Sequence, residues 1–326
     1  MTPVKIAVLG AGRIAGIVSA TLSKLEEIEC YAVAARDLSR AEQFARDHGF
    51  QKAYGSYEEM LRDPEVELVY IATPHSHHFE HLMLCLHAGK HVICEKSFTM
   101  NTAQARQAVE LARSRGVYLA EAIWTRYMPS RRMIDELLSS GIIGKPHILT
   151  ANLAYPSSSV PRIQRPELAG GALLDLGVYG INFALMHFGD DIARIESSAQ
   201  MTETGVDGTE SITFLYRDGR AAVLTHSVYG RSDRRGVVYG DKGYLVAWSI
   251  NNVQTISVYD TNDVLIAHHE VPKQISGYEY EFQEAARCIR TGKTESESMP
   301  LDRTIQVMEI MDTLRAQWGL VYPQEQ

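Results

Sequence analysis

The stretch Gly10-Ala11-Gly12-Arg13-Ile14-Ala15 directly follows an apolar run at residues 4–9 and opens a segment with helical spacing. This strand, turn and helix context gives the pattern G-x-G-x-x-G/A its meaning as a dinucleotide fingerprint. Gly10 permits the tight turn, Gly12 lets the backbone approach a pyrophosphate, and Ala15 allows close packing of the helix on the strand. The amides at the helix start then face the phosphates. The stretch predicts a dinucleotide site that includes Gly10, Gly12, Arg13 and Ile14.

Apolar strands and helical segments alternate outward from this stretch as far as residue 123. The expected strands are Val4–Leu9, Cys30–Ala35, Leu68–Ala72, His91–Cys94 and Tyr118–Ala122. Capping pairs at Ser39 with Glu42 and Ser56 with Glu59, and glycines at 49, 89 and 116, indicate helices at 40–48, 57–62, 78–88 and 102–115. The alternation predicts an α/β fold with a doubly wound parallel sheet, a Rossmann domain, over residues 1–123.

The sequence changes character after residue 123. A helix is expected near 130–139, and from His147 onward strands dominate. Turns with a glycine, at 217–219 and 241–243, separate strands such as 211–216, 221–228 and 244–249, which indicates antiparallel pairing. Two more helices are expected at 279–291 and 301–318. Residues 124–326 therefore predict a C-terminal α+β domain with a large, mostly antiparallel open sheet, for substrate binding and dimerisation.

Composition and charge narrow the classes of function. The 326 residues, 45% hydrophobic and 22% charged, are ordinary for a globular protein and enough for two domains. The net charge of -8 and the scattered basic residues argue against a nucleic acid partner. Neither a signal peptide nor an apolar run near the ~20 residues of a membrane span is recognised, so no membrane partner is expected. The four cysteines form no CxxC pair, which favours a reducing compartment, the cytoplasm.

The end of the second expected strand bears on the choice of dinucleotide. NAD enzymes place a carboxylate on the ribose hydroxyls there, whereas NADP enzymes offer a basic residue to the 2′-phosphate. Here the strand ends Ala34-Ala35-Arg36-Asp37, with Ser39 and Arg40 just beyond. Arg36 and Arg40 can hold a phosphate by charge-assisted hydrogen bonds, which favours NADP. Asp37 keeps NAD open, because a strand end shifted by two residues would bring its carboxylate to the ribose.

Two further motifs follow strands of the first domain, at the carboxyl edge where open α/β sheets bind ligands. They are Thr73-Pro74-His75-Ser76-His77-His78, and Ala88-Gly89-Lys90-His91-Val92 followed by Glu95-Lys96-Ser97. With the fingerprint they resemble the glucose-fructose oxidoreductase / inositol dehydrogenase / rhizopine catabolism family, whose hallmarks are TP-x-x-x-H and AGKHV-x-x-EKP. Only the Pro of EKP is missing, replaced by Ser97. The resemblance implies that Thr73, Pro74, His78 and Glu95 belong to the cofactor site, with His78 near the nicotinamide.

The resemblance continues at residues 170–182, GGALLDLGVYGIN, where the family pattern is GG-x-x-x-D-x-G-x-H-x-x-D. Tyr179 replaces that His, and Asn182 replaces the last Asp. Together with Glu121-Ala122-Ile123-Trp124-Thr125-Arg126-Tyr127, this segment is similar to the dimeric dihydrodiol dehydrogenase branch, in which a Lys and a Tyr are the proposed catalytic pair. The resemblance spans nearly the whole chain and implies that Lys96 and Tyr179 are catalytic.

The chemistry of these side chains agrees with that role. Oxidising a carbinol removes the hydroxyl proton while a hydride leaves carbon for the nicotinamide. Tyr179 can be the base if the Lys96 ammonium stabilises its phenolate and lowers a pKa that is about 10 when unperturbed. Asp175, four residues before Tyr179, would face the same side of a helix and orient Lys96 or a substrate hydroxyl. The alternatives are packing for Tyr179, and helix capping or a structural salt bridge for Asp175.

Two other groups of residues invite a functional interpretation. His75, His77, His78 and His81 offer imidazoles that suit zinc, but no carboxylate or Cys lies nearby at ligand spacing, so no metal site is predicted. Trp124, Arg126 and Tyr127 follow the last strand of the first domain, where they are expected to line the substrate pocket. Interdomain packing is the alternative for these three.

The leading hypothesis is an NAD(P)-dependent dehydrogenase or reductase, with NADP as the cofactor, acting on a small diol, sugar or polyol. A second hypothesis is a non-catalytic NADP-sensing regulatory protein on the same fold, because a fold does not fix a function. Turnover of a panel of carbonyls and diols would distinguish the two. Because an open antiparallel sheet must cover its apolar side, a homodimer through that face is expected.

Overall fold

The computed structural model describes residues 2–326, which form two compact units. The first unit comprises the chain up to Tyr127 together with Gln274–Glu309, and the second comprises Met128–Lys273 and Ile310–Gln326. The sequence predicted a single division after residue 123. In the structure the chain returns to the first unit for residues 274–309, so that unit is built from two separate segments.

The first unit contains a six-stranded parallel sheet in the order β3-β2-β1-β4-β5-β6. Its strands are β1 (Val4–Leu9), β2 (Ile28–Ala34), β3 (Lys52–Tyr54), β4 (Leu68–Ile71), β5 (His91–Glu95) and β6 (Leu119–Ala122). The predicted doubly wound parallel sheet is confirmed. The sequence missed β3, because a three-residue edge strand with no fully buried position carries no apolar run.

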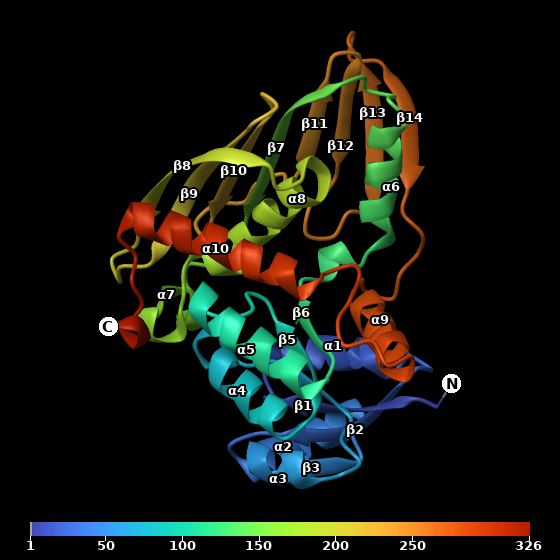
Figure 1. Ribbon diagram of the computed structural model, residues 1–326, viewed down its shortest axis with the longest axis vertical. Helices are drawn as coiled ribbons and strands as arrows, with labels where there is room; N and C mark the ends of the chain where they lie inside the picture. Colours follow the sequence, from blue (N-terminus) through green and yellow to red (C-terminus); the bar gives the residue numbers. More distant parts are fainter. Residues whose placement is uncertain (1) are drawn as a thin grey trace. The chain divides into compact units, whose positions relative to one another are not determined.

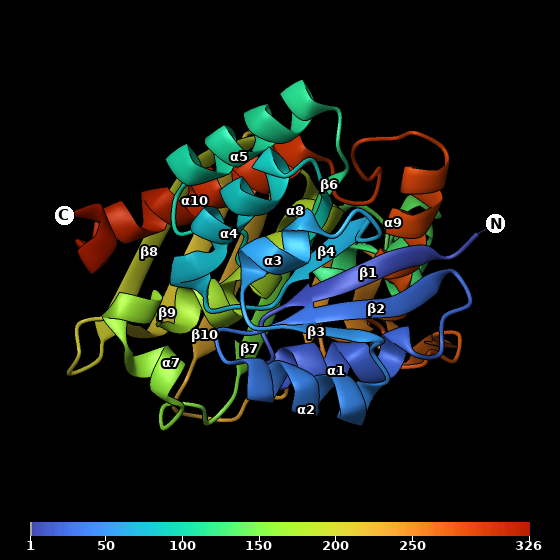
Figure 2. The ribbon, with the colours of Figure 1, turned by 90° about the horizontal axis from the view of Figure 1, so that it is seen from below.

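Helices cover both faces of this sheet, with α1 and α2 on one face and α4 and α5 on the other (Figure 2). The helices of the unit are α1 (Arg13–Leu22), α2 (Leu38–His48), α3 (Tyr57–Arg62), α4 (His75–His87), α5 (Thr102–Arg115), η1 (Trp124–Arg126) and α9 (Glu279–Arg290). The expected cap at Ser56 is confirmed, since its hydroxyl accepts from the Glu59 amide. The expected start of α2 is wrong: Asp37, not Ser39, caps it, so this helix begins at residue 38.

The return of the chain is explained by the apolar face of α9. Phe282 is fully buried in the core of the first unit and meets Tyr70 of β4 edge to face, with ring centroids 5.3 Å apart. Ala285, Ala286 and Cys288 are buried in the same core. Burying a side chain such as Phe contributes roughly 1.5–3 kcal/mol, so α9 is part of what stabilises this unit.

The second unit contains an eight-stranded sheet in the order β14-β13-β12-β11-β7-β10-β9-β8 (Figure 1). Its strands are β7 (Pro146–Ala154), β8 (Ile192–Met201), β9 (Asp207–Tyr216), β10 (Ala221–Ser227), β11 (Gly236–Gly240), β12 (Gly243–Ala247), β13 (Thr255–Asp260) and β14 (Leu265–Glu270). All neighbours pair antiparallel except β7 with β10. The predicted large, mostly antiparallel sheet is confirmed.

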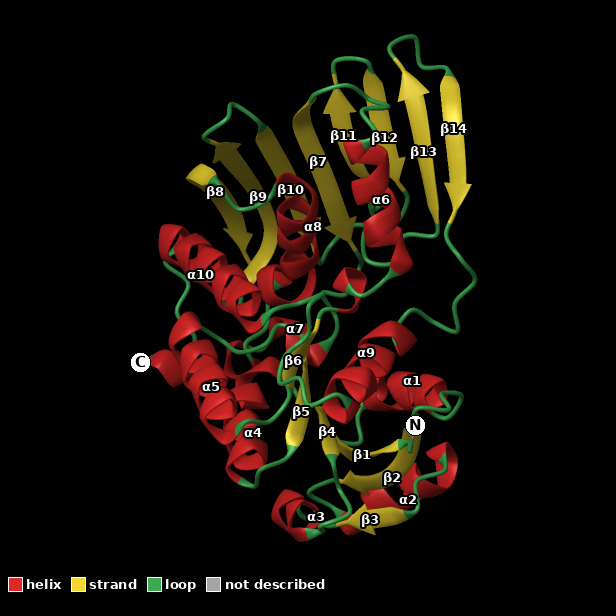
Figure 3. Ribbon diagram, turned by 45° about the vertical axis from the view of Figure 1, so that its right-hand side comes forward, coloured by secondary structure: helices red, strands yellow, loops and turns green. Residues whose placement is uncertain are grey.

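Helices lie against one face of this sheet, α6 and α8 among them (Figure 3). The helical segments of the unit are α6 (Pro129–Ser139), α7 (Pro161–Gln164), η2 (Pro166–Leu168), η3 (Leu173–Gly177), α8 (Val178–Phe188) and η4 (Pro323–Glu325); α10 (Leu301–Trp318) begins in the first unit and ends in the second. Side chains alternate along the strands, so that Leu149 and Leu224 are buried beneath the helices while Ile148 and Val223 are exposed on the other face. We call that other face the open face.

One segment of the second unit, Pro166–Phe188, is apolar and long enough to span a membrane. Since 89% of the most apolar 18-residue window of this segment is buried inside the fold, packing in the core of the unit accounts for its apolar composition.

Candidate active site

The glycine-rich turn after β1 shows which glycine the fold itself requires. Gly10 has φ +101°, and a Cβ there would lie 3.0 Å from Thr73 Cγ2 and 3.3 Å from the Ala72 carbonyl oxygen. Gly12 differs, because a Cβ there would meet nothing closer than the Ala72 oxygen at 3.8 Å. The protein can therefore accommodate a Cβ at position 12, and the open backbone there fits a ligand that approaches closely.

The start of α1 fits the phosphates of a dinucleotide. Gly12 is the N-cap residue and contributes no side-chain hydrogen bond, so the first amides of α1 are not capped by a side chain. Ala15 is fully buried, as close packing of helix on strand requires. Arg13 and Ile14 are the first two residues of the helix. The turn and the helix start thus have the form of an anion site.

Beyond β2, the one acidic side chain is engaged in the protein and the basic ones remain at the surface. Asp37 caps α2, where its Oδ1 accepts from the Ser39 amide at 2.9 Å and the Ser39 hydroxyl at 2.7 Å. These hydrogen bonds hold the pKa of Asp37 below its usual value. Arg40 donates to the Ala11 carbonyl at 3.3 Å, so its guanidinium lies beside the glycine-rich turn. Arg36 is exposed. The arrangement offers positive charge, not a free carboxylate, at this edge.

His78 connects the ends of two neighbouring strands. It is fully buried; its Nδ1 lies 2.8 Å from the carbonyl oxygen of Ser97, which follows β5, and its Nε2 lies 2.8 Å from that of Thr73, which follows β4. Burial lowers the pKa of His78, against the effect of these carbonyls. Both ring nitrogens face backbone carbonyls, so His78 bridges the two motifs. The place near the nicotinamide that the resemblance implied stays a prediction.

The other histidines of this segment also contact neighbouring side chains. His81 Nδ1 lies 2.9 Å from the Thr73 hydroxyl, and burial lowers its pKa to about 4. His77 Nδ1 lies 2.9 Å from the Ser76 hydroxyl, and Pro74 is the N-cap residue of α4. Across residues 2–326, no group of three or more His, Cys, Asp or Glu side chains is placed to hold a metal ion.

Lys96 is half-buried immediately after β5, and the peptide bond that follows it is cis. Glu95, the last residue of β5, is buried and accepts a hydrogen bond from the Tyr70 hydroxyl. Glu121 of the adjacent strand β6 is fully buried, and its Oε1 accepts from the Phe98 amide at 3.2 Å. Burial raises the pKa of Glu121 to about 7, although the charges of Arg126 and Lys96 act in the opposite direction. In the sequence Glu121 belonged to the motif at residues 121–127 without a role of its own, although an acidic residue inside an apolar strand was a visible signal.

The three residues expected to line the substrate pocket are buried. Trp124 stacks on Tyr278 of the same unit, with ring centroids 4.1 Å apart and an interplanar angle of 11°. The Tyr127 hydroxyl donates to the Glu121 carbonyl at 3.0 Å, and Arg126 is only 4% exposed. These contacts show packing within the first unit, and a contact with substrate stays a prediction.

In the second unit, Asp175 and Tyr179 lie on consecutive helical turns. Asp175 belongs to the π-helical turn η3, and Tyr179 lies at the start of α8. Such wider turns occur frequently at functional sites. Arg162 of α7 binds Asp175 with both nitrogens, Nη1 to Oδ1 at 2.8 Å and Nη2 to Oδ2 at 3.3 Å. The salt bridge considered for Asp175 is therefore present, and its partner Arg162 was missed because nothing in the sequence links the two positions.

Within each unit the structure brings together part of the predicted set. In the first unit, Gly10, Thr73 and His78 form a connected group, and His78 links this group to the Lys96–Ser97 turn. In the second unit, Asp175 and Tyr179 share one helical segment. The pairing of Lys96 with Tyr179 stays a prediction.

Comparison with known proteins agrees with this organisation. The profile of the oxidoreductase family with an NAD-binding Rossmann fold matches residues 4–122, and that of the GFO/IDH/MocA C-terminal domain matches residues 132–246. Trans-1,2-dihydrobenzene-1,2-diol dehydrogenase of Mus musculus is 36% identical over 333 residues, covering 98% of each chain. The Homo sapiens enzyme of the same name is 36% identical over 326 residues, again covering 98% of each.

Solved structures share the fold. A 3-ketoreductase from Actinomadura kijaniata, crystallised with NADP and TDP-benzene, superposes with a TM-score of 0.89 at 23% identity, covering 96% of this chain and 97% of the other. The aldose-aldose oxidoreductase of Caulobacter crescentus gives 0.86 at 19% identity, covering 95% and 96%. With two matching domain profiles and relatives that align over nearly the full length, this chain belongs to the GFO/IDH/MocA family of NAD-binding oxidoreductases.

Proposed function

We propose that this protein is an NADP-dependent dehydrogenase that oxidises a small diol or related polyol, or reduces the corresponding carbonyl. The substrate class is supported by the full-length relatives named as diol dehydrogenases. The observation that carries the nucleotide binding is Gly12. The fold accommodates a Cβ at this position, yet the residue is glycine, and it lies at the start of α1, where no side chain caps the helix.

In the proposed oxidation the substrate C–H bond breaks as a hydride and the O–H bond breaks as a proton. The nicotinamide, when bound, supplies the hydride acceptor. Tyr179 takes the hydroxyl proton, and the Lys96 ammonium stabilises the phenolate that this proton transfer requires. In reduction Tyr179 returns the proton to the oxygen. Asp175 orients the reacting groups, and the bidentate contact from Arg162 fixes its carboxylate.

The choice of NADP rests on the edge of β2. The Asp37 carboxylate is already used to cap α2, whereas Arg40 lies beside the glycine-rich turn and Arg36 is exposed. Gly10, Gly12, Arg13, Ile14, Thr73, Pro74 and Glu95 complete the proposed cofactor site; His78 acts on it from behind, by holding the turns after β4 and β5.

Replacing Arg36 by alanine is expected to weaken NADPH binding about tenfold or more, because a hydrogen bond to a charged partner contributes about 1.5–3 kcal/mol. NADH binding should stay unchanged, since NADH lacks the 2′-phosphate. Fluorescence titration of the purified protein with each nucleotide measures both. The control is Arg46→Ala, an exposed arginine on the following helix α2 that donates to Gln43. Equal loss for both nucleotides would contradict the assignment of Arg36, and tighter NADH than NADPH binding in the unaltered protein would contradict the choice of NADP.

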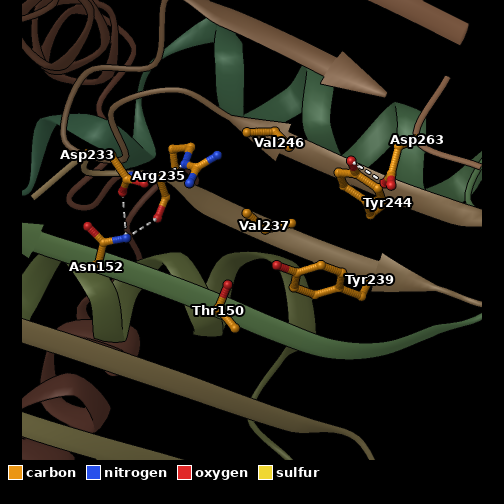
Figure 4. Close-up of a pocket in the computed structure, with 9 residues that line it drawn as sticks. All are labelled: Thr150, Asn152, Asp233, Arg235, Val237, Tyr239, Tyr244, Val246 and Asp263. Atoms are coloured by element: carbon orange, nitrogen blue, oxygen red, sulfur yellow. Dashed lines mark hydrogen bonds and ion pairs between the residues drawn. The ribbon is translucent and has the colours of Figure 1, made fainter. Parts of the chain in front are cut away.

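We further propose a homodimer formed through the open face. A shallow pocket on this face is lined by Thr150, Asn152, Asp233, Arg235, Val237, Tyr239, Tyr244, Val246 and Asp263 (Figure 4). Tyr239, Tyr244 and Tyr259, on the adjacent strands β11, β12 and β13, form a row there. The rings of Tyr244 and Tyr259 stack with their centroids 5.0 Å apart. Ile148, Val223 and Trp248 are 36–46% exposed. Large side chains exposed together on a sheet are typical of interfaces between proteins.

The cytoplasm is the proposed compartment, and four free cysteines support it.

Val223→Glu is expected to convert a dimer into a monomer, because it would bury a charge at the centre of the proposed interface. Light scattering after size-exclusion chromatography measures the mass. Val264→Glu makes the same chemical change at a residue that is 55% exposed in the turn between β13 and β14, and should leave the dimer intact. A monomeric unaltered protein, or a dimer that tolerates Val223→Glu, would refute this interface.

A further inference from the structure

The segment Gly170–Gly180 carries both Asp175 and Tyr179, and it lies on the inner surface of the second sheet. The π-helical turn η3 in this segment contacts β7, β9 and β10. Strands β9 and β10 pair antiparallel, with Glu210 directly opposite His226. The side chains beneath the segment therefore come from strands, which position them independently of the helix that they support.

Three glycines of the segment each lie against one ionisable side chain. A Cβ on Gly171 would be 2.1 Å from Asp207 Oδ1, and a Cβ on Gly177 would be 2.2 Å from Glu210 Oε1. In the third contact, a Cβ on Gly180 would be 2.2 Å from His226 Nε2. At such distances a new Cβ would force the buried side chain beneath it to move. The glycines at 171, 177 and 180 are thus explained by what lies under them, and we call Asp207, Glu210 and His226 the buried triad.

One hydrogen bond links the buried triad to the segment, and another joins two of its members. Asp207 Oδ2 accepts from the Leu173 amide, at 2.6 Å, where η3 begins. His226 Nδ1 lies 2.6 Å from Glu210 Oε1. All three residues are at most 1% exposed. The triad therefore fixes how far the segment lies from the sheet, at the start, the middle and the end of the segment.

Burial favours the uncharged forms of these groups. It raises the pKa of Asp207 to about 7, raises that of Glu210 and lowers that of His226 to about 3. A neutral Glu210 carboxyl can donate to a neutral His226 ring, which leaves the pair without net charge in the core. Tyr322 is the other buried ionisable neighbour; its hydroxyl donates to the Gly170 carbonyl at 2.9 Å and anchors the first end of the segment.

We infer that Asp207, Glu210 and His226 are positioning residues for the reaction, because they set where the segment places Asp175 and Tyr179. The inference rests on the proposed function of those two residues. None of the triad needs to touch substrate or cofactor. A displacement of about 1 Å in a reacting group can lower a rate about 100-fold, so the distance between this segment and the sheet affects turnover.

The central test compares three replacements of Glu210 in the complete protein, assayed with NADP⁺ and trans-1,2-dihydrobenzene-1,2-diol. Glu210→Ala and Glu210→Asp withdraw the carboxyl from Gly177 and His226, and should lower kcat about tenfold or more while KM and NADPH affinity stay within about threefold. Glu210→Gln matches the neutral carboxyl in shape and should restore kcat. The control for replacing a glutamate of this sheet is Glu196→Ala, at an exposed residue of β8, which should leave kcat unchanged.

A second test measures the contact without using activity. Gly180→Ala should lower the melting temperature by several degrees, because its new methyl group meets His226. In a His226→Ala background the same change should be neutral or stabilising, since the obstructing ring is gone. This cycle remains informative if Glu210→Ala does not fold.

The outcomes separate the inference from the proposed function. An unaltered protein that neither oxidises a diol or polyol nor reduces the corresponding carbonyl refutes the proposed function, and the inference falls with it even if the cycle shows the contact. An active protein in which Glu210→Asp and Glu210→Ala keep full kcat refutes the inference alone. Equal loss of melting temperature from Gly180→Ala in both backgrounds refutes the contact on which the inference stands.

Discussion

Lys96→Met is expected to lower turnover about 100-fold or more while nucleotide binding stays within about threefold of the unaltered protein. Methionine keeps much of the length and volume of the lysine stem and removes only the ammonium. A positioned proton-transfer group contributes about 10²–10⁴-fold to a rate, and because the proton transfer by Tyr179 requires the Lys96 ammonium, kcat should fall by that factor. Steady-state kinetics with NADP⁺ and a diol, beside an NADPH titration, measure the two quantities separately.

The matched control is Lys24→Met, an exposed lysine of the same unit that lies just beyond α1. It should leave both kcat and nucleotide affinity unchanged. Full turnover in Lys96→Met would remove Lys96 from the mechanism. Lost nucleotide binding would instead assign Lys96 to the cofactor and leave the proton chemistry to other groups.

Gly12→Val is expected to lower nucleotide affinity about 100-fold or more while lowering the melting temperature by less than Gly10→Ala does. A Cβ at position 12 meets nothing closer than 3.8 Å and φ is -96°, so the fold accepts it. The pyrophosphate would lose its close approach to the backbone, along with charge-assisted hydrogen bonds that each contribute about 1.5–3 kcal/mol. NADPH titration and thermal unfolding of the same sample check both halves of this prediction.

Gly10→Ala provides the contrast two residues earlier. Its φ of +101° disfavours any side chain, and the new methyl group would press on Thr73, so this variant should unfold at a lower temperature. Equal loss of stability in both variants would mean that Gly12 is also a requirement of the fold. Unchanged NADPH affinity in Gly12→Val would refute the fingerprint.

Much of the fold could be predicted because its signals are local. The runs at 4–9, 68–72 and 118–122 are continuous because both faces of their sheet are covered, and they matched β1, β4 and β6 within a residue. The start of α2 was misplaced because two oxygen-bearing residues, Asp37 and Ser39, could both cap it, and only the backbone shows that Asp37 does. The return of residues 274–309 to the first unit depends on the apolar face of α9, which does not reveal which core it will join.

The candidate site divides in the same way. Gly10 and Gly12 could be found because a turn and a helix start depend on adjacent residues. Arg162 and Glu210 could not, because their partners lie 13 and 33 positions away, across a loop and a strand register that sequence periodicity does not fix. The glycine pattern at 171, 177 and 180 was visible, but the side chains that require it were not.

The division of the first unit into two chain segments also governs how the protein emerges from the ribosome. Residues 128–273, most of the second unit, are synthesised before α9 exists. Until Phe282 and its neighbours arrive, the face of the nascent Rossmann sheet at Tyr70 lacks its cover, even though every strand of that sheet has already been made. The first unit therefore begins to fold long before its core can be completed, and chaperones that recognise exposed apolar surface have a long opportunity at this face.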